Sequence, residues 1–223
     1  MQFNGEELTF KRIFTFVFGL FVMSFGVSFS IASTLGTTPI SSMAYAMALV
    51  TNLSVGTTTF LFNAGLIAVQ FLILRSQFSK KRLLQLINCV VFSYFIDVAM
   101  IFVSGIPFDG SALMCFAYLV LSIFLIALGI FIYLPSNIAP LPGEGCVEAI
   151  SIVTGWRFSS VKIGFDATIV ALALIICWIW YTDVFGAVYI GTVISAFFVG
   201  YTLRQLSNIY RHITGREINV VHR

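Results

Sequence analysis

The stretch ALMCFAYLVLSIFLIALGIFIYL, residues 112–134, decides the fold class of this chain. It has no charged side chain, and it is longer than the roughly 20 residues that a helix needs to cross the hydrocarbon core of a bilayer. Of all 223 residues, 59% are hydrophobic and only 9% are charged. Soluble domains carry about 25% charged residues, which excludes a soluble enzyme or a nucleic-acid binder. The sequence predicts an all-α polytopic membrane protein.

Five more stretches are long and apolar enough to span a bilayer. Together with residues 112–134, the predicted spans are 13–34, 57–74, 83–104, 112–134, 163–181 and 184–203. Two other apolar pieces, 39–50 and 142–153, hold about a dozen residues each, or some 18 Å of helix at about 1.5 Å per residue. They are too short to cross, and each begins with a proline that suits the first turn of a helix. We therefore expect two re-entrant half-helices.

The chain contains an internal sequence repeat, in which residues of the first half align with residues a fixed number of positions later. The offset aligns these identical residues: Gly26 with Gly129, Ser33 with Ser136, Pro39 with Pro142, Ala46 with Ala149, Val50 with Val153, Thr51 with Thr154, Phe62 with Phe165, Ala64 with Ala167 and Ala68 with Ala171. Such internal similarity indicates a duplication. We expect one membrane domain with repeat 1 at about 13–104, repeat 2 at about 112–204 and a short cytoplasmic tail at 205–223.

The basic residues predict the topology, because Lys and Arg favour the cytoplasmic side of a membrane. If both short pieces turn back, all 12 Lys and Arg lie on the same side as the two termini. If both crossed, the basic cluster at 75–82 would lie outside. Six spans are therefore favoured, with cytoplasmic N- and C-termini, and three crossings per half place the second half upside down. Inverted repeats with broken helices near the midplane are typical of secondary transporters.

Acidic side chains inside a membrane are costly and are candidates for function. Four acids fall in the predicted membrane region: Asp97, Glu144, Glu148 and Asp166. Glu144 and Glu148 are spaced i and i+4 on the second half-helix and so share one face. They predict a site for a cation, an ammonium group or an exchangeable proton. The structural alternative is that they pair with Arg157 or Lys162 and hold the half-helix in place.

Asp166 leaves two interpretations open. It follows Lys162 by four residues, a spacing that allows an ion pair on one helix. It is alternatively a coupling site near the half-helix, where the offset places the near-isosteric Asn63 in repeat 1.

Asp97 stands inside the third span without a basic residue nearby in the sequence. It is either a protonatable relay or a neutral acid that is bonded to Asn88 or Ser93. Desolvation often keeps an isolated acid protonated.

The first half-helix is neutral and carries the hydroxyls of Thr37, Thr38, Ser41 and Ser42 near its start. The free backbone N–H groups at a helix N-terminus, together with hydroxyls, can receive a carboxylate. The alternative is that the hydroxyls only cap the helix. With the acidic half-helix opposite, the two ends would suit a zwitterion such as a small amino acid.

Several motifs resemble the YczE/YyaS/YitT family of bacterial membrane proteins. They are the glycine-rich pattern of 26–39, its echo at 141–145, and the pattern Ser-x-x-Lys-x-x-x-Asp at 159–166. The likeness covers about residues 10–205. Because no C-terminal soluble domain is expected, the chain resembles the shorter YczE-like branch. The resemblance implies a bacterial inner-membrane protein and leaves its activity open.

The function favoured by these patterns is transport of a small polar solute through a central site at the half-helices. The alternatives are a substrate-capture subunit of a larger transporter, a passive channel and a non-transporting membrane scaffold. An enzyme is not expected, since no nucleophile–base pair, phosphate loop or metal-ligand spacing occurs. We expect neither cofactor nor metal nor nucleic acid. The expected partners are the lipid bilayer, the solute, and a second copy or another membrane protein.

Overall fold

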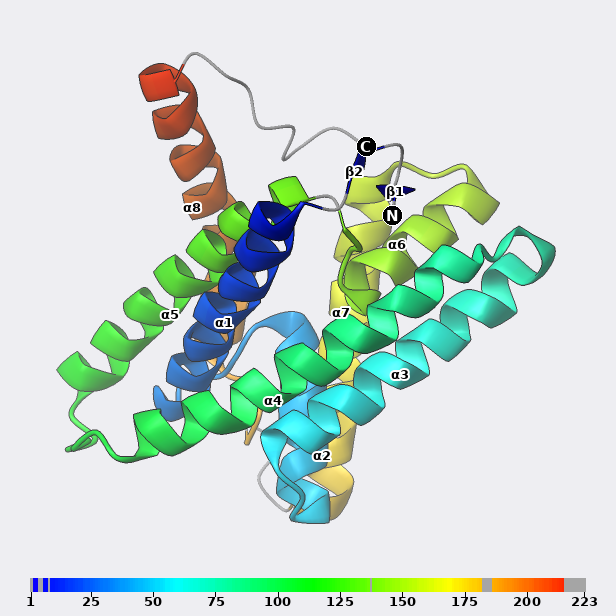
Figure 1. Ribbon diagram of the computed structural model, residues 1–223. Coiled ribbons are helices and arrows are strands. Elements are labelled where there is room, and N and C mark those ends of the chain that lie inside the picture. The colour runs from blue at the N-terminus through cyan, green and yellow to red at the C-terminus, as the bar shows by residue number, and fades with distance from the viewer. Residues whose placement is uncertain (1, 4–5, 8, 137, 182–185, 215–223) are drawn as a thin grey trace.

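The computed structural model describes residues 2–3, 6–7, 9–136, 138–181 and 186–214. These residues form eight α-helices after two short paired strands, β1 (Gln2–Phe3) and β2 (Glu6–Glu7) (Figure 1). The helices are α1 (Phe10–Ala32), α2 (Pro39–Thr51), α3 (Val55–Leu74), α4 (Leu84–Ser104), α5 (Ala112–Tyr133), α6 (Pro142–Thr154), α7 (Phe158–Ile176) and α8 (Ile190–Thr214). The short turns are η1 (Arg75–Gln77), η2 (Lys80–Leu83), η3 (Leu134–Ser136) and η4 (Cys177–Tyr181), the last a π-helical continuation of α7.

Within the described residues, five helical stretches are long and apolar enough to cross a membrane. They are Phe10–Ala32, Val55–Gln77, Leu84–Ser104, Ala112–Ser136 and Phe158–Tyr181. These match the first five predicted spans, so the helical membrane architecture is confirmed. The start of the sixth predicted span, 184–203, lies outside the described residues. Helix α8 continues to Thr214, so the first part of the predicted tail is helical, and residues 215–223 lie outside the described part.

The two short helices, α2 and α6, share one local design. Each has 13 residues and starts with a proline after an extended residue, as predicted for the half-helices. Each ends in a left-handed residue, Asn52 with φ 57° and Gly155 with φ 71°. Asn and Gly tolerate this conformation and terminate helices in the same way. The offset of the sequence repeat aligns Asn52 with Gly155.

The core contains a close crossing of α1 and α5, which lie side by side in Figure 1. A Cβ at Gly26 would be 2.7 Å from the backbone nitrogen of Ile126, and one at Gly129 would be 2.7 Å from that of Met23. The repeat aligns Gly26 with Gly129 and Met23 with Ile126, so the two contacts are equivalent. Small residues allow this approach of two helix backbones.

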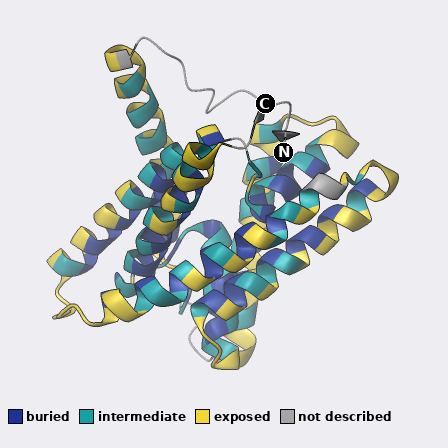
Figure 2. Ribbon diagram, viewed as in Figure 1, coloured by how far each residue is buried: buried dark blue, intermediate teal, exposed yellow. Residues whose placement is uncertain are grey.

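Other helix contacts come in equivalent pairs as well. Helix α1 packs on α4 as α5 packs on α8, and α3 packs on α6 as α7 packs on α2. The Gly191 N–H donates to the Leu35 carbonyl at 2.6 Å, and the side chain of Asn88, the repeat equivalent of Gly191, donates from Nδ2 to the Ala139 carbonyl at 3.4 Å, one residue past the equivalent of Leu35. Figure 2 shows buried residues where the helices face each other and exposed residues on the outer faces and at the ends.

Candidate functional site

The first turns of α2 and α6 meet inside the bundle. Ile40 of α2 packs on Gly143 of α6, where a Cβ would be 2.6 Å from Ile40 Cδ1. The prolines that begin the two helices, Pro39 and Pro142, are buried. In Figure 1, α2 runs from the middle of the molecule to its lower edge, and α6 ends near the upper edge. The positive ends of two helix dipoles therefore face each other at the contact of Ile40 with Gly143.

The hydroxyls at the start of α2 are mostly engaged locally. Thr38 Oγ1 donates to Ser41 Oγ at 2.9 Å, and the buried Ser42 donates to the Pro39 carbonyl at 2.7 Å. Thr38 precedes the helix, but its side chain makes no capping hydrogen bond. Thr37 differs: its side chain is fully buried, and its hydroxyl has no hydrogen-bond partner among the described residues. A buried hydroxyl without a partner lowers the stability of a fold. This cost sets Thr37 apart from the other hydroxyls at the start of α2.

Glu144 and Asp166, two predicted site residues, lie in one electrostatic cluster. The Tyr133 hydroxyl at the end of α5 donates to Glu144 Oε2 at 3.1 Å. Lys162 Nζ is 2.7 Å from Asp166 Oδ1, so the ion pair read from the i, i+4 spacing is confirmed. Lys162 and Asp166 both interact electrostatically with Glu144. Helices α5, α6 and α7 thus bring two acids, one base and a phenol together.

Glu148 points to a different partner from the one expected. Its carboxylate accepts from Arg82 Nη2 at 3.1 Å. The predicted structural pairing with Arg157 or Lys162 is wrong for Glu148, because Lys162 is paired with Asp166 and Arg157 precedes α7 as an exposed residue. The shared-face geometry of Glu144 and Glu148 therefore does not make a two-carboxylate site: each acid meets a separate set of groups.

Three side chains from the α3–α4 region hold α6 from one side, and we call Gln70, Arg82 and Gln85 the polar clamp. Gln70 Nε2 donates to Gln85 Oε1 at 3.0 Å and to the Pro142 carbonyl at 3.1 Å. Arg82 Nη1 donates to Gln70 Oε1 at 3.2 Å and lies 3.4 Å from the Gly145 carbonyl. Gly145 makes room, since a Cβ there would be 2.8 Å from both amides. The polar clamp fixes the first turns of α6.

Asn63 is buried on α3, on the face that meets α6. One turn further along this face, the Leu66 carbonyl accepts from Cys146 Sγ of α6 at 3.1 Å, and Gln70 follows after another turn. Asn63 therefore lies in line with the polar clamp and farther from the η1 end of α3.

Asp97 lies at another place in the fold. Its carboxylate accepts from Ser54 Oγ at 2.8 Å and from the Gly56 N–H at 2.7 Å, at the N-terminus of α3. One of the two interpretations of Asp97, a hydrogen bond to Asn88 or Ser93, is wrong: α3 crosses α4 closely at Gly56, and the Gly56 N–H and the Ser54 hydroxyl reach Asp97 instead. A negative carboxylate suits a helix N-terminus. The structure thus separates Asp97 from the acids around α6.

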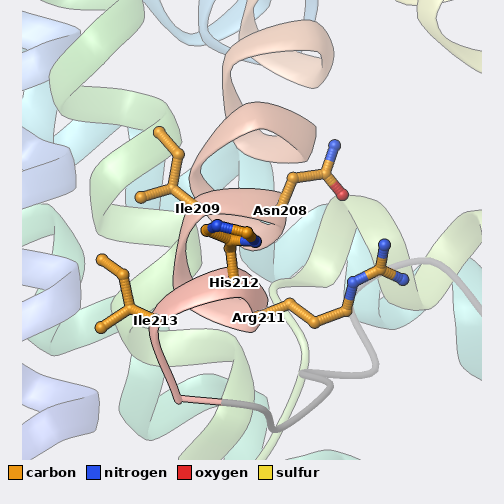
Figure 3. Close-up of a pocket in the computed structure, with 5 residues that line it drawn as sticks. All are labelled: Asn208, Ile209, Arg211, His212 and Ile213. Carbon is orange, nitrogen blue, oxygen red and sulfur yellow. The ribbon is translucent and has the colours of Figure 1, made fainter.

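A hollow of about 660 Å³ lies around the last turns of α8 (Figure 3). The residues that line it are Asn208, Ile209, Arg211, His212 and Ile213. In the picture, the two isoleucines point to one side of α8 and Asn208 and Arg211 to the other. All five belong to one helix, and none is a predicted site residue, so this hollow is not the candidate site.

Among the described residues, no three His, Cys, Asp or Glu side chains come together as a metal site would require. The four cysteines are buried and form no disulfide with one another. Buried thiols of this kind behave as small hydrophobic side chains.

Comparison with known proteins supports the resemblance seen in the sequence. Residues 10–208 match a family of unknown function, DUF6198. The chain belongs to this family. It is 26% identical over 200 residues to the uncharacterized membrane protein YczE of Bacillus subtilis (strain 168), which covers 89% of this chain and 86% of that protein. No solved structure matches. This DUF6198 protein is thus a membrane protein similar to YczE.

In this DUF6198 protein, sequence reasoning missed the polar clamp. The repeat offered a signal, since it aligns Gln70 with Ala173 and Gln85 with Val188. Ala173 and Val188 pack with Ala46 of α2 in an apolar cluster. Equivalent positions therefore surround α6 with amides and α2 with hydrocarbon. A polar residue in an apolar run, with an apolar repeat equivalent, is the pattern that could have predicted the polar clamp.

Proposed function

We propose that this protein carries a small polar solute across a bacterial inner membrane, at the meeting point of α2 and α6. The contact of Ile40 with Gly143 carries the proposal, because it places the N-termini of two short helices head to head in the interior, next to Glu144. A helix that ends at membrane depth leaves backbone N–H groups without intrahelical partners, and transporters use such ends to bind solutes.

The proposed topology has six spans and two inverted halves, with both termini in the cytoplasm. Five of the spans are the apolar helical stretches, and the sixth is the first part of α8. The equivalent contacts of Gly26 and Gly129 support a two-fold relation between the halves. So do the matching caps of α2 and α6. In this arrangement α2 and α6 are re-entrant from opposite sides.

The charge of the two helix ends favours a zwitterionic solute, such as a small amino acid. The first turn of α2 holds no acidic residue, whereas that of α6 holds Glu144. The α2 end, with its N–H groups and the hydroxyls of Thr37 and Ser41, suits a carboxylate, whereas the Ser42 hydroxyl already donates to the Pro39 carbonyl. Glu144 suits an ammonium group. Since the Ile40 side chain fills the space over Gly143, the solute enters when Ile40 moves away.

The other predicted site residues take supporting parts in this proposal. Asp166 holds Lys162 in an ion pair, and the positive charge of Lys162 and the negative charge of Asp166 act on Glu144 in opposite directions. Glu148 holds α6 through Arg82, and Asn63 lies on the neighbouring face of α3. Asp97 is remote from this solute site.

A second candidate function is a non-transporting membrane scaffold. It is favoured by the fact that the four membrane-region acids already have internal partners: Asp97 with Ser54 and Gly56, Glu144 with Tyr133, Glu148 with Arg82 and Asp166 with Lys162. Acids that serve only to hold helices together would look the same. Transport assays separate the two candidates.

The test is uptake of radiolabelled small amino acids by proteoliposomes that contain the purified protein. We expect time-dependent uptake of at least one of them, reduced at least tenfold by Glu144→Gln. Asp109→Asn, in an exposed loop, is the matched control and should transport normally. If no amino acid is taken up and none raises the unfolding temperature, the zwitterion proposal is wrong. Uptake that is unchanged in Glu144→Gln would remove Glu144 from the site.

A further inference from the structure

A groove of about 310 Å³ lies between α3 and α4, apart from the site at α6. Its lining residues are Gly56, Thr57, Phe60, Val90, Ser93, Tyr94 and Asp97. It is open to the outside of the bundle, because the side chains of Tyr94 and Val90 are 66% and 54% exposed. Both helices are long and apolar enough to cross a membrane, so we expect lipid to contact this outer face.

One end of the groove is polar and negatively charged. Asp97 accepts hydrogen bonds from Ser54 and from the Gly56 N–H, but no described Lys or Arg forms an ion pair with it. A carboxylate has about four lone-pair sites, so it can accept further donors. Ser93 lines the same groove, is 6% exposed, and its hydroxyl has no hydrogen-bond partner in the described part of the chain. A cationic donor is what this end lacks.

The other end of the groove is apolar, with Phe60 on α3 and Val90 on α4. Val90 precedes Asp97 by two helical turns, about 10 Å along α4. Asp97 is level with the exposed Ser54 at the N-terminus of α3, where the apolar helix begins. The polar end therefore lies at the start of α3, and Phe60 lies about one turn further along this apolar helix. A phospholipid has the same order of head and chain.

We propose that this groove binds phosphatidylethanolamine, with its ammonium group at Asp97 and one acyl chain along Phe60 and Val90. The ammonium supplies the positive charge and N–H donors that Asp97 lacks, and Ser93 adds a hydroxyl to the headgroup contacts. Phosphatidylcholine fits less well, because its methylated nitrogen has no N–H to donate. This inference does not depend on solute transport.

The first test uses the unmodified protein and lipids with zero to three methyl groups on the headgroup nitrogen. Binding in detergent micelles is measured by native mass spectrometry under competition. We expect about a tenfold preference for phosphatidylethanolamine over phosphatidylcholine, the effect of one charge-assisted hydrogen bond, with a marked loss at the third methyl group. Equal binding of the whole series would overturn the proposal. So would equal protection against unfolding by water-soluble phosphoethanolamine, which has no acyl chain.

Variants locate the binding site in the groove. Asp97→Asn should abolish the headgroup preference, and Val90→Trp, which fills the apolar end, should lower lipid occupancy several-fold. Val120→Trp is the matched control, since Val120 is 49% exposed on α5, outside the groove, and it should bind lipid normally. If Asp97→Asn does not fold, Val90→Trp and the lipids with zero to three headgroup methyl groups still test whether phosphatidylethanolamine binds in the groove. An undiminished preference in folded Asp97→Asn, or equal occupancy in the two Trp variants, would show that the lipid binds elsewhere.

Discussion

The guanidinium of Arg82 lies 3.1 Å from the carboxylate of Glu148 and joins the α3–α4 connection to the short helix α6. The two partners are unequal. The Arg82 side chain is 15% exposed and also contacts Gln70 and the Gly145 carbonyl, whereas the Glu148 side chain is 45% exposed. Arg82 is therefore the centre of a hydrogen-bond network, and Glu148 is its outer member.

Because of this inequality, Arg82→Met should destabilise the protein more than Glu148→Gln. Loss of Arg82 leaves the buried Gln70 Oε1 without its donor, at a cost of about 1–3 kcal/mol. Loss of the half-exposed charge of Glu148 should cost about 0–1 kcal/mol. Unfolding midpoints in the same detergent measure both effects. A larger effect of Glu148→Gln would contradict the network.

The close crossing of α1 and α5 predicts that Gly129→Ala is destabilising. The added Cβ would be 2.7 Å from the backbone nitrogen of Met23, and a backbone cannot move aside as a side chain can. Overpacking of this kind costs about 1–3 kcal/mol. Gly164→Ala in α7 is the control: outside its own helix backbone, no atom of the described residues would lie within 4 Å of the added Cβ, so better helix propensity should leave stability equal or up to about 1 kcal/mol higher. Similar unfolding midpoints for Gly129→Ala and Gly164→Ala would contradict the close contact of α1 with α5.

The proposed topology predicts opposite accessibility for two exposed positions, 79 and 109. We expect a membrane-impermeant thiol reagent to label Asp109→Cys in intact cells and Ser79→Cys only after the membrane is opened. The four native cysteines are buried, so their background labelling should be low. Labelling of Ser79→Cys from outside would mean that a short helix crosses the membrane, and the inverted-repeat proposal would fail.

The loop before α5 should respond to pH through Asp109. The backbone N–H of Ser111 donates to its carboxylate at 2.8 Å, and this hydrogen bond holds the pKa of Asp109 below its ordinary value. A lowered pKa in the folded state means that the stabilisation is present above the unfolded pKa and is lost as the pH falls through the folded one. NMR titration of the Ser111 amide should follow this proton, with a flat curve in Asp109→Asn. A titration midpoint at or above the ordinary Asp value would contradict the contact.

The helices could be predicted from the sequence because each depends on residues that are close together in the chain. Apolar runs of sufficient length predicted the five spanning stretches, and a leading proline with a dozen apolar residues predicted α2 and α6. The Lys162–Asp166 ion pair, one of the two interpretations of Asp166, could be read from the sequence for the same reason, since four residues along a helix place two side chains together whatever the rest of the fold does.

The partners of the other acids were decided by the tertiary structure. Arg82 reaches Glu148 across 66 residues of sequence, and Asp97 reaches Ser54 across 43. Neither separation produces a periodic pattern. The sequence by itself determined which segments are apolar helices, where they break and which acids lie among them. Only the packing of α3 against α4 and α6 decided what each acid meets, because a buried charge takes whichever donors the neighbouring helices bring within reach.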